Sequence, residues 1–366
     1  MNQTAESVTE GHPDKVADYI ADSILDAYMA QDPHARVACE VLCKSGTVVL
    51  AGEFTSSATV DQDAVVRDAI RQIGYIDETA PFSADGVDII QLITRQAEEI
   101  RQGVDRDGKD FGAGDQGIMI GYASDDSPEL MPLPILLAHR LTERLAADRR
   151  QKRAPWLKPD GKAQVTVAYE GDTPAAVTDV IVSAQHEESA PQDQIRGYVE
   201  GELLPEVLGQ WMDETIRIHV NPAGSFVHGG PGVDCGLTGR KNIADTYGPT
   251  VPHGGGSFSG KDPTKVDRSA AYFCRYVARR AVQSGIARRV LVRVAYAIGE
   301  PRPVALDVET FGTGDEAAAL DFVQRYDFRP ASLIDRLRLR RAGYRATTNY
   351  GHFGRPGFTW EMTPGV

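Results

Sequence analysis

The sequence has 366 residues, 42% of them hydrophobic and 25% charged, which is the composition of an ordinary folded protein and excludes a disordered or fibrous chain. Its length predicts two or three domains. With 52 acidic and 39 basic residues, the formal net charge is −13. This charge disfavours general binding to nucleic acid, so any anion must be bound by a local group of cations.

The first third of the chain predicts a helix, a hairpin, a second helix and a further strand. Val16, Ile20 and Ile24 recur at helical spacing, and the short connection Lys44-Ser45-Gly46 is typical of a hairpin. Gly74 is a good helix terminator. The expected elements are a helix at 14–30, strands at 36–43 and 47–55, a helix at 61–73 and a strand at 87–94.

The same order of elements recurs twice. The second unit has expected helices at 134–147 and 192–208 and expected strands at 163–169, 176–184 and 215–220. The third has expected helices at 263–284 and 316–325 and strands at 289–298 and 304–311, and its last strand is not identifiable. Three units with a period of about 120 residues predict three α/β (α+β) sheets covered by helices. Tight turns between strands make these sheets mostly antiparallel or mixed.

The cysteine content, the N-terminus and the lack of a long apolar run predict a cytoplasmic protein. The four cysteines have no zinc-site spacing and are too sparse for a disulfide scaffold, so we expect reduced and mostly buried thiols. The polar N-terminus does not resemble a signal peptide. The longest nearly apolar run, residues 130–138, is too short to span a membrane.

Residues 10–15, Glu-Gly-His-Pro-Asp-Lys, predict a helix N-terminus that binds an anion. Pro13 suits the first helical position, and the free N–H groups that follow attract negative charge. His12 is placed to donate to a phosphate oxygen, and Asp14 is a hard ligand for Mg²⁺. An ordinary acidic helix start explains the same residues.

A glycine-rich segment at 253–262 leads into a second candidate site. It nearly matches a P-loop, but Asp262 stands where a P-loop needs Ser or Thr, so we reject a P-loop NTPase. We expect Asp262 to cap the following helix and Pro263 to begin it. Lys261 and Lys265 would then oppose the helix dipole, a conflict that a bound anion relieves. A solvated, charged helix start is the alternative.

Two further loops complete the candidate site. Arg240 and Lys241 follow two glycines and suit a polyphosphate, although paired basic residues are often only a solvated surface. Asp115 lies on a glycine-rich loop that can bind ribose or metal, or form a simple turn. The candidate cations are His12, Lys162, Arg240, Lys241, Lys261 and Lys265, and the candidate metal ligands are Asp14 and Asp267. Together they indicate a Mg²⁺-dependent enzyme acting on a nucleoside polyphosphate.

Taken together, five segments resemble the S-adenosylmethionine synthetase family. They are EGHPDK (10–15), GAGDQG (112–117), CGLTGRK (235–241), GGSFSGKDPTKVDRSAAY (255–272) and YGHFGR (350–355). The resemblance implies three similar domains around a pseudo-threefold axis, here 1–99, 112–230 and 231–366. It also implies a homodimer or dimer of dimers with active sites between subunits.

The implied reaction transfers the adenosyl group of ATP to the sulfur of L-methionine, or of an S-alkyl analogue, and hydrolyses the triphosphate. The implied ions are Mg²⁺ at Asp14 and Asp267 and K⁺ at Glu40. The resemblance places catalytic groups at His12, Lys162, Arg240, Lys261 and Lys265. It places ATP contacts at His12, Asp160, Lys162, Ser225, Phe226, Asp234, Arg240, Lys241, Ser257 and Lys261. It places methionine contacts at Glu53, Gln96, Asp234 and Lys265, an active-site loop carboxylate at Asp115, and a mobile loop at 96–108.

Several residues depart from the family's pattern near the ATP contacts. Ser225 stands where Arg is usual, Ser257 where Ala is usual, and His228 where an aliphatic residue is usual. Val233 replaces Gly, and a position that needs a positive φ would resist Val. The other departures are Asn242 and Pro249. We therefore predict weaker ATP binding or altered substrate tolerance, and we keep two other hypotheses: a non-catalytic partner of an active homologue and a generic nucleotide phosphohydrolase.

Overall fold

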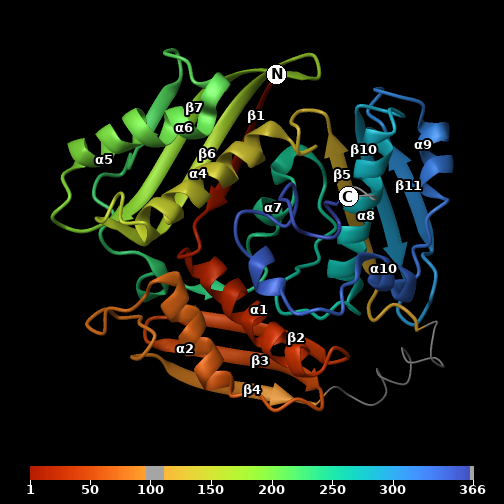
Figure 1. Ribbon diagram of the computed structural model, residues 1–366, viewed down its shortest axis with the longest axis horizontal. Helices are drawn as coiled ribbons and strands as arrows, with labels where there is room; N and C mark the ends of the chain where they lie inside the picture. The colour runs from red at the N-terminus through yellow and green to blue at the C-terminus, as the bar shows by residue number, and fades with distance from the viewer. Residues whose placement is uncertain (96–110, 363–366) are drawn as a thin grey trace.

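The computed structural model describes residues 1–95 and 111–362, which form three lobes around a centre where α7 (Asn242–Asp245) lies (Figure 1). Each lobe is a sheet with helices on one face. Two sheets are mixed and the third is antiparallel. The predicted α+β fold, with three similar domains in a pseudo-threefold arrangement, is confirmed.

Each sheet takes one edge strand from a different third of the chain. The sheet orders are β4-β3-β2-β9, β1-β6-β7-β8 and β11-β10-β5. The exchanged antiparallel pairs are β9 (Gly236–Leu237) with β2 (Arg36–Lys44), β1 (Asn2–Val8) with β6 (Leu157–Glu170), and β5 (Gly117–Ser124) with β10 (Arg289–Tyr296). A cut at the predicted boundaries would therefore take a strand from every sheet, and those boundaries stay a prediction.

The first lobe agrees with the expected order of elements. Its remaining members are α1 (Pro13–Gln31), β3 (Thr47–Thr55), α2 (Gln62–Ile73) and β4 (Asp88–Thr94). Helix α1 begins at Pro13 and is buried over most of its surface, so it acts as a central helix. Gly74 ends α2 in the left-handed conformation with φ 111°, as a helix-terminating glycine should.

The second lobe contains a broken helix where the sequence predicted a continuous one at 192–208. Its remaining elements are α4 (Leu133–Arg150), β7 (Thr173–His186), α5 (Gln192–Tyr198), a π-helical turn (Val199–Leu203), α6 (Leu204–Leu208) and β8 (Arg217–Val220). Pro205 has no N–H to donate to the preceding turn, which explains why the regular α-helical ladder is interrupted here.

The third lobe corrects the predicted start of its long helix. Helix α8 (Val266–Gln283) has Lys265 at its N-cap, so Asp262 does not cap it and Pro263 does not begin it. The Asp262 carboxylate instead accepts bonds from the backbone N–H groups of Val37 and Thr264, at 2.8 and 2.9 Å. The lobe also contains β11 (Ala305–Glu309), α9 (Glu316–Val323) and α10 (Pro330–Leu337).

The strand that the sequence left unidentified in the third unit is not found among the described residues. Helix α10 follows α9 instead, and it buries Leu333, Ile334 and Leu337 at helical spacing. The third sheet therefore has no counterpart of the parallel strands β4 and β8 within residues 1–95 and 111–362.

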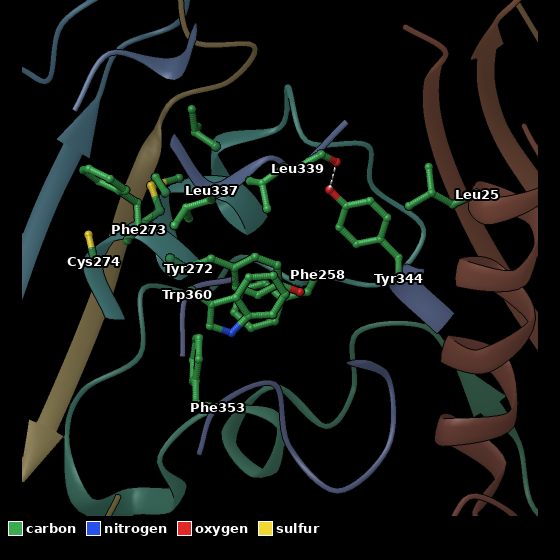
Figure 2. Close-up of a cluster of buried hydrophobic side chains, with 14 of the residues drawn as sticks. Leu25, Phe258, Tyr272, Phe273, Cys274, Leu337, Leu339, Tyr344, Phe353 and Trp360 are labelled. Atoms are coloured by element: carbon green, nitrogen blue, oxygen red, sulfur yellow. Dashed lines mark hydrogen bonds between the residues drawn. The ribbon is translucent and has the colours of Figure 1, made fainter. Parts of the chain in front are cut away.

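The C-terminal segment is tied to the centre of the molecule by aromatic packing (Figure 2). The ring of Trp360 stacks on Tyr272 at 3.8 Å between centroids, and its indole N–H donates to the His352 carbonyl at 2.8 Å. Phe258 and Phe353 contact Tyr272 edge-on. This cluster anchors both α8 and the loop before it, which carries Lys261 and Lys265.

The cysteines are free thiols, as predicted: Cys39, Cys43 and Cys274 are buried and Cys235 is partly exposed. Over the described parts of the chain, every helix is too short or too polar to cross a lipid bilayer.

Candidate active site

The N-terminus of α1 lies against the end of β6. Pairing of β1 with β6 sets Val8 opposite Lys162, and the chain then continues past Gly161 to His12. The approach is close enough that a Cβ on Gly11 would meet the backbone of Pro159 at 2.3 Å, so only glycine fits. Strand pairing therefore brings His12 beside Asp160 and Lys162, which are about 150 positions later in the sequence.

Asp14 is buried at the first turn of α1 and collects donors from the loop at 237–241. Its carboxylate accepts from the Leu237 N–H at 3.1 Å and forms ion pairs with Lys241 at 2.5 Å and Arg240 at 3.2 Å. Burial alone would raise the pKa of Asp14, but the Lys241 ammonium and the Leu237 N–H outweigh it and lower the pKa. The two predicted phosphate-binding cations thus meet a predicted metal ligand.

His12 is neutral in this environment. Burial, with the positive charges of Lys241 and Lys162, lowers the pKa of His12 to about 3. Its Nδ1 accepts a bond from the Asp14 N–H at 3.2 Å, which leaves the proton on Nε2. His12 is therefore a neutral donor beside Asp14, Lys162, Arg240 and Lys241, and we call these five residues the first site group.

Asp160 is a buried carboxylate with one unused oxygen. Its Oδ2 accepts from the Gly230 N–H at 2.8 Å, and its Oδ1 has no hydrogen-bond partner. Burial raises the pKa of Asp160 to about 6. A buried acceptor without a partner is costly, and a ligand hydroxyl or amine would satisfy it.

Two residues that the sequence did not indicate hold this region in place. Gln185 accepts from the Asp160 N–H at 3.1 Å and donates to the Val227 carbonyl at 3.1 Å. The His186 ring accepts from the Phe226 N–H at 3.0 Å, and the His186 N–H donates to the Phe226 carbonyl at the same distance. A Gln-His pair at the end of a strand was the only available signal, and it carries no specific chemistry.

A cavity of about 700 Å³ opens beside the first site group. Of the first site group, Arg240 and Lys241 line this cavity, together with His253, Gly255 and the strand residues Glu6 and Gln164. The volume lies within the usual range for small-molecule sites. A cation-lined space of this size suits a nucleotide.

Lys261, Lys265 and Asp267 form a second cluster on the glycine-rich loop and the first turn of α8. Lys261 pairs with Asp267, and Lys265 pairs with Asp262 at 2.5 Å. Burial alone would raise the pKa of Asp262, but Lys265 outweighs it and lowers the pKa. Lys261 forms a β-bridge to Ala38, which is paired with Glu53 in the hairpin, so Glu53 lies across Ala38 from Lys261 in the sheet. We call Glu53, Lys261, Lys265 and Asp267 the second site group.

The remaining predicted site residues lie around these two groups. Asp234 is exposed, but it is near enough to His12 to influence its pKa. Glu40 is exposed and accepts a bond from the Thr238 hydroxyl. Asp115 is exposed and accepts from the Gln116 N–H, and Ser225 is exposed on the loop before Phe226. Gln96 and the whole of the predicted mobile loop 96–108 lie outside the described residues.

The structure shows the surroundings of two residues that depart from the family's pattern, Val233 and Ser257. Val233 has φ −115°, which is ordinary for valine, so the expected conflict with a positive φ is absent. Ser257 lies against the loop of Arg240, because a Cβ on Gly239 would meet the Ser257 Cβ at 2.6 Å. The extra hydroxyl of Ser257 therefore lies at the contact between the two glycine-rich loops.

Comparison with known proteins agrees with this geometry. Residues 1–98, 110–226 and 228–362 match the models of the S-adenosylmethionine synthetase N-terminal, central and C-terminal domains. An S-adenosylmethionine synthase of Thermus thermophilus is 53% identical over 383 aligned residues, covering 99% of this chain and 96% of the relative. One of Sorangium cellulosum is 50% identical over 370 residues, covering 98% and 87%. The chain therefore belongs to the S-adenosylmethionine synthetase family.

Proposed function

We propose that the chain transfers the adenosyl group of ATP to the sulfur of L-methionine and hydrolyses the released triphosphate to pyrophosphate and phosphate. The observation that supports it best is the convergence of the first site group beside a 700 Å³ cavity, in a chain of this family. The enzyme is then an ATP:L-methionine S-adenosyltransferase. The alternatives of a non-catalytic partner or a simple phosphohydrolase have no supporting observation.

The residues suit a displacement at C5′ of ATP. The thioether sulfur of methionine is already nucleophilic, so the reaction needs no general base, and a neutral His12 is consistent with that. The lone pair of the methionine sulfur forms the new S–C bond, and the bonding pair of the C5′–O bond leaves with the triphosphate. The barrier therefore depends on orientation and on stabilising negative charge on the departing oxygens.

The proposed contacts lie in the two site groups and on the loops around them. We assign the phosphates to His12, Lys162, Arg240, Lys241 and Lys261, and the nucleoside to Asp160, Ser225, Phe226, Asp234 and Ser257. We assign methionine to Glu53, Gln96, Asp234 and Lys265, and a loop role to Asp115. Asp160 Oδ1, buried and without a partner, is the nucleoside contact with the most direct structural support.

Asp14 and Asp267 would hold Mg²⁺ with the phosphates, where the ion would neutralise charge on the leaving group. Asp267 fits this role because Gly256 leaves room beside it: a Cβ there would meet Oδ1 at 2.6 Å. No cluster of three or more acidic, His or Cys ligands occurs in residues 1–95 and 111–362, so substrate oxygens and water would supply the rest of the coordination. K⁺ at Glu40 stays a prediction, as does the cytoplasmic location.

We further infer a homo-oligomer, a dimer or a dimer of dimers, with each site shared between subunits. Apolar side chains are exposed on the sheets, with Ile90 and Leu92 on β4 at 47% and 60% exposure and Ile118 on β5 at 53%. Such surface favours burial against a second copy. Among the described residues, no hydrogen bond or ion pair joins the first site group to the second, so a partner can bring them together.

The assay follows methionine-dependent conversion of ATP to S-adenosylmethionine, pyrophosphate and phosphate. We expect Lys241→Met to raise the KM for ATP at least tenfold, while Lys152→Met, on an exposed turn, leaves it unchanged. Phosphate release that does not need methionine would overturn the proposal. Comparing methionine with S-ethyl homocysteine tests the predicted change in substrate tolerance.

Mixing inactive variants tests the shared site. Lys241→Met disables the first site group and Lys261→Met the second. If each site combines the two groups from different subunits, a mixed dimer holds one intact site, and activity returns on mixing. Activity that stays at the level of the separate variants would contradict a shared site.

A further inference from the structure

Four aspartates stand at intervals of four residues along α1: Asp14, Asp18, Asp22 and Asp26. Residues four apart lie on one face of a helix, so these carboxylates form a continuous row. Each accepts at least one backbone N–H from a loop of the C-terminal third: Leu237 for Asp14, Gly239 for Asp18, Gly260 for Asp22, and Gly343, Tyr344 and Arg345 for Asp26. We call these four residues the aspartate row.

Asp18 and Asp22 are fully buried, which is unusual for carboxylates and requires partners. The Lys15 ammonium lies 3.0 Å from Asp18 and 2.6 Å from Asp245. Arg268 donates to both oxygens of Asp22, at 2.7 and 2.6 Å. Each of these two buried carboxylates therefore has a cationic partner in addition to its backbone N–H donor, as a buried acid requires.

The N–H groups held by Asp18 and Asp22 occupy equivalent places in the two phosphate loops. Asp18 accepts from Gly239 at 3.0 Å, and the next two residues are Arg240 and Lys241. Asp22 accepts from Gly260 at 2.8 Å, and the next residue is Lys261. In each case the anchored amide directly precedes a proposed phosphate contact.

Both anchored residues are glycines in the left-handed region, with φ +72° for Gly239 and +80° for Gly260. Glycine has the widest conformational freedom of any residue, so such a turn needs an external restraint to hold one geometry. Arg268 adds a second restraint, because it donates to the Lys261 carbonyl at 3.1 Å. A loop held this way presents its cations with little entropy left to lose when phosphate binds.

We propose that Asp18 and Asp22 are positioning residues, which fix from one helix the turns that carry Lys241 and Lys261. This inference rests on the proposed role of those lysines as phosphate contacts. Neither aspartate touches substrate in this arrangement: each acts through the backbone amide before a cation. Asp26 holds the segment 343–345, which carries no proposed substrate contact, so it provides a matched control.

The test uses the full-length protein with ATP, methionine and inorganic tripolyphosphate as separate probes. We expect Asp18→Ala to raise the KM for ATP and for tripolyphosphate about tenfold and to leave the KM for methionine within twofold. Asp18→Asn retains an oxygen for the Gly239 N–H but loses the charge, so a smaller rise of about threefold is expected. Asp26→Ala should lower the unfolding midpoint without moving any KM.

If the aspartate row has a purely structural role, Asp18→Ala and Asp26→Ala lower stability alike, and the KM values for ATP and for tripolyphosphate stay unchanged. That result would overturn the inference. If Asp18→Ala does not fold, Asp18→Asn compared with Asp26→Asn decides: equal KM values for tripolyphosphate overturn it. Lys241→Met separates a failure of the proposed function from a failure of this inference. If Lys241→Met leaves the KM for ATP and for tripolyphosphate unchanged, Lys241 is not a phosphate contact, and the inference fails with it. If Lys241→Met raises these KM values while Asp18→Ala does not, only the inference fails.

Discussion

Asp160→Asn should make the protein more stable at neutral and alkaline pH while weakening its binding of ATP. Asp160 is only 7% exposed, and its Oδ1 has no partner. An amide of the same shape removes a buried charge and can still accept the Gly230 N–H. The proposed nucleoside contact loses its charge, so we expect the KM for ATP to rise about tenfold.

The size of the stability gain follows from the pKa of Asp160, which burial raises from 3.8 to about 6. The folded state binds the proton more tightly than the unfolded state, so the associated stability is present below pH 3.8 and is lost as the pH rises through 6. At about 1.4 kcal/mol per pH unit, the ionised carboxylate costs about 3 kcal/mol at pH 8. By the same relation it costs about 1 kcal/mol at pH 4.5. The asparagine variant does not titrate and avoids both costs.

Urea unfolding at pH 4.5 and pH 8, at one protein concentration, measures this difference. We expect the gain of Asp160→Asn to be about 2 kcal/mol larger at pH 8 than at pH 4.5. Asp262→Asn provides a control, because the pKa of Asp262 is lowered from 3.8 in its pair with Lys265. Its stabilisation is nearly complete above pH 3.8, so this variant should lose about the same stability at pH 4.5 and at pH 8. An Asp160→Asn gain that is the same at both pH values would refute the reasoning.

Three further predictions concern the frame around the site. Trp360→Ala should lower the free energy of unfolding by about 3–5 kcal/mol, because it removes a buried stacked ring, and a loss below about 1 kcal/mol in urea would contradict this. Gly260→Ala should reduce kcat/KM at least tenfold, since its Cβ would lie 1.9 Å from the Cys39 carbonyl, whereas Gly285→Ala, with a similar φ of +78° and open space, should not. Nitrogen NMR should show the His12 ring neutral from pH 5 to 9, and a titration midpoint near 6.5 would show the lowered pKa to be wrong.

Much of the site was visible in the sequence because short motifs place chemistry next to a helix start. The helix that begins at Pro13 follows from local preferences, and the structure confirms it, with His12 at the N-cap. The start of α8 was placed wrongly for a related reason. Asp262 followed by Pro263 has the local form of a cap, but the carboxylate is drawn into a tertiary contact with the Val37 N–H. A local pattern cannot reveal such a competing partner.

Local sequence patterns also could not predict β1 and β9, which pair with strands from another third of the chain. The Asn2–Val8 segment is largely polar and contains no strong strand signal, and it becomes β1 because β6 offers it a full ladder of backbone bonds. The two-residue strand β9 exists only because β2 lies beside it. Backbone pairing depends on which segment is the neighbour, and side-chain periodicity says nothing about that.

The residues themselves determined most of the helices, the hairpins, the three-unit order and the identity of the cations, because these depend on local spacing and side-chain chemistry. Folding decided which cations meet: Lys241 reaches Asp14 across 227 positions of sequence, and Gly260 reaches Asp22 across 238. It also decided which charges persist, since burial makes His12 neutral and leaves Asp160 with an unsatisfied oxygen. Both outcomes depend on the removal of water around a side chain, and only the packed chain defines where water is removed.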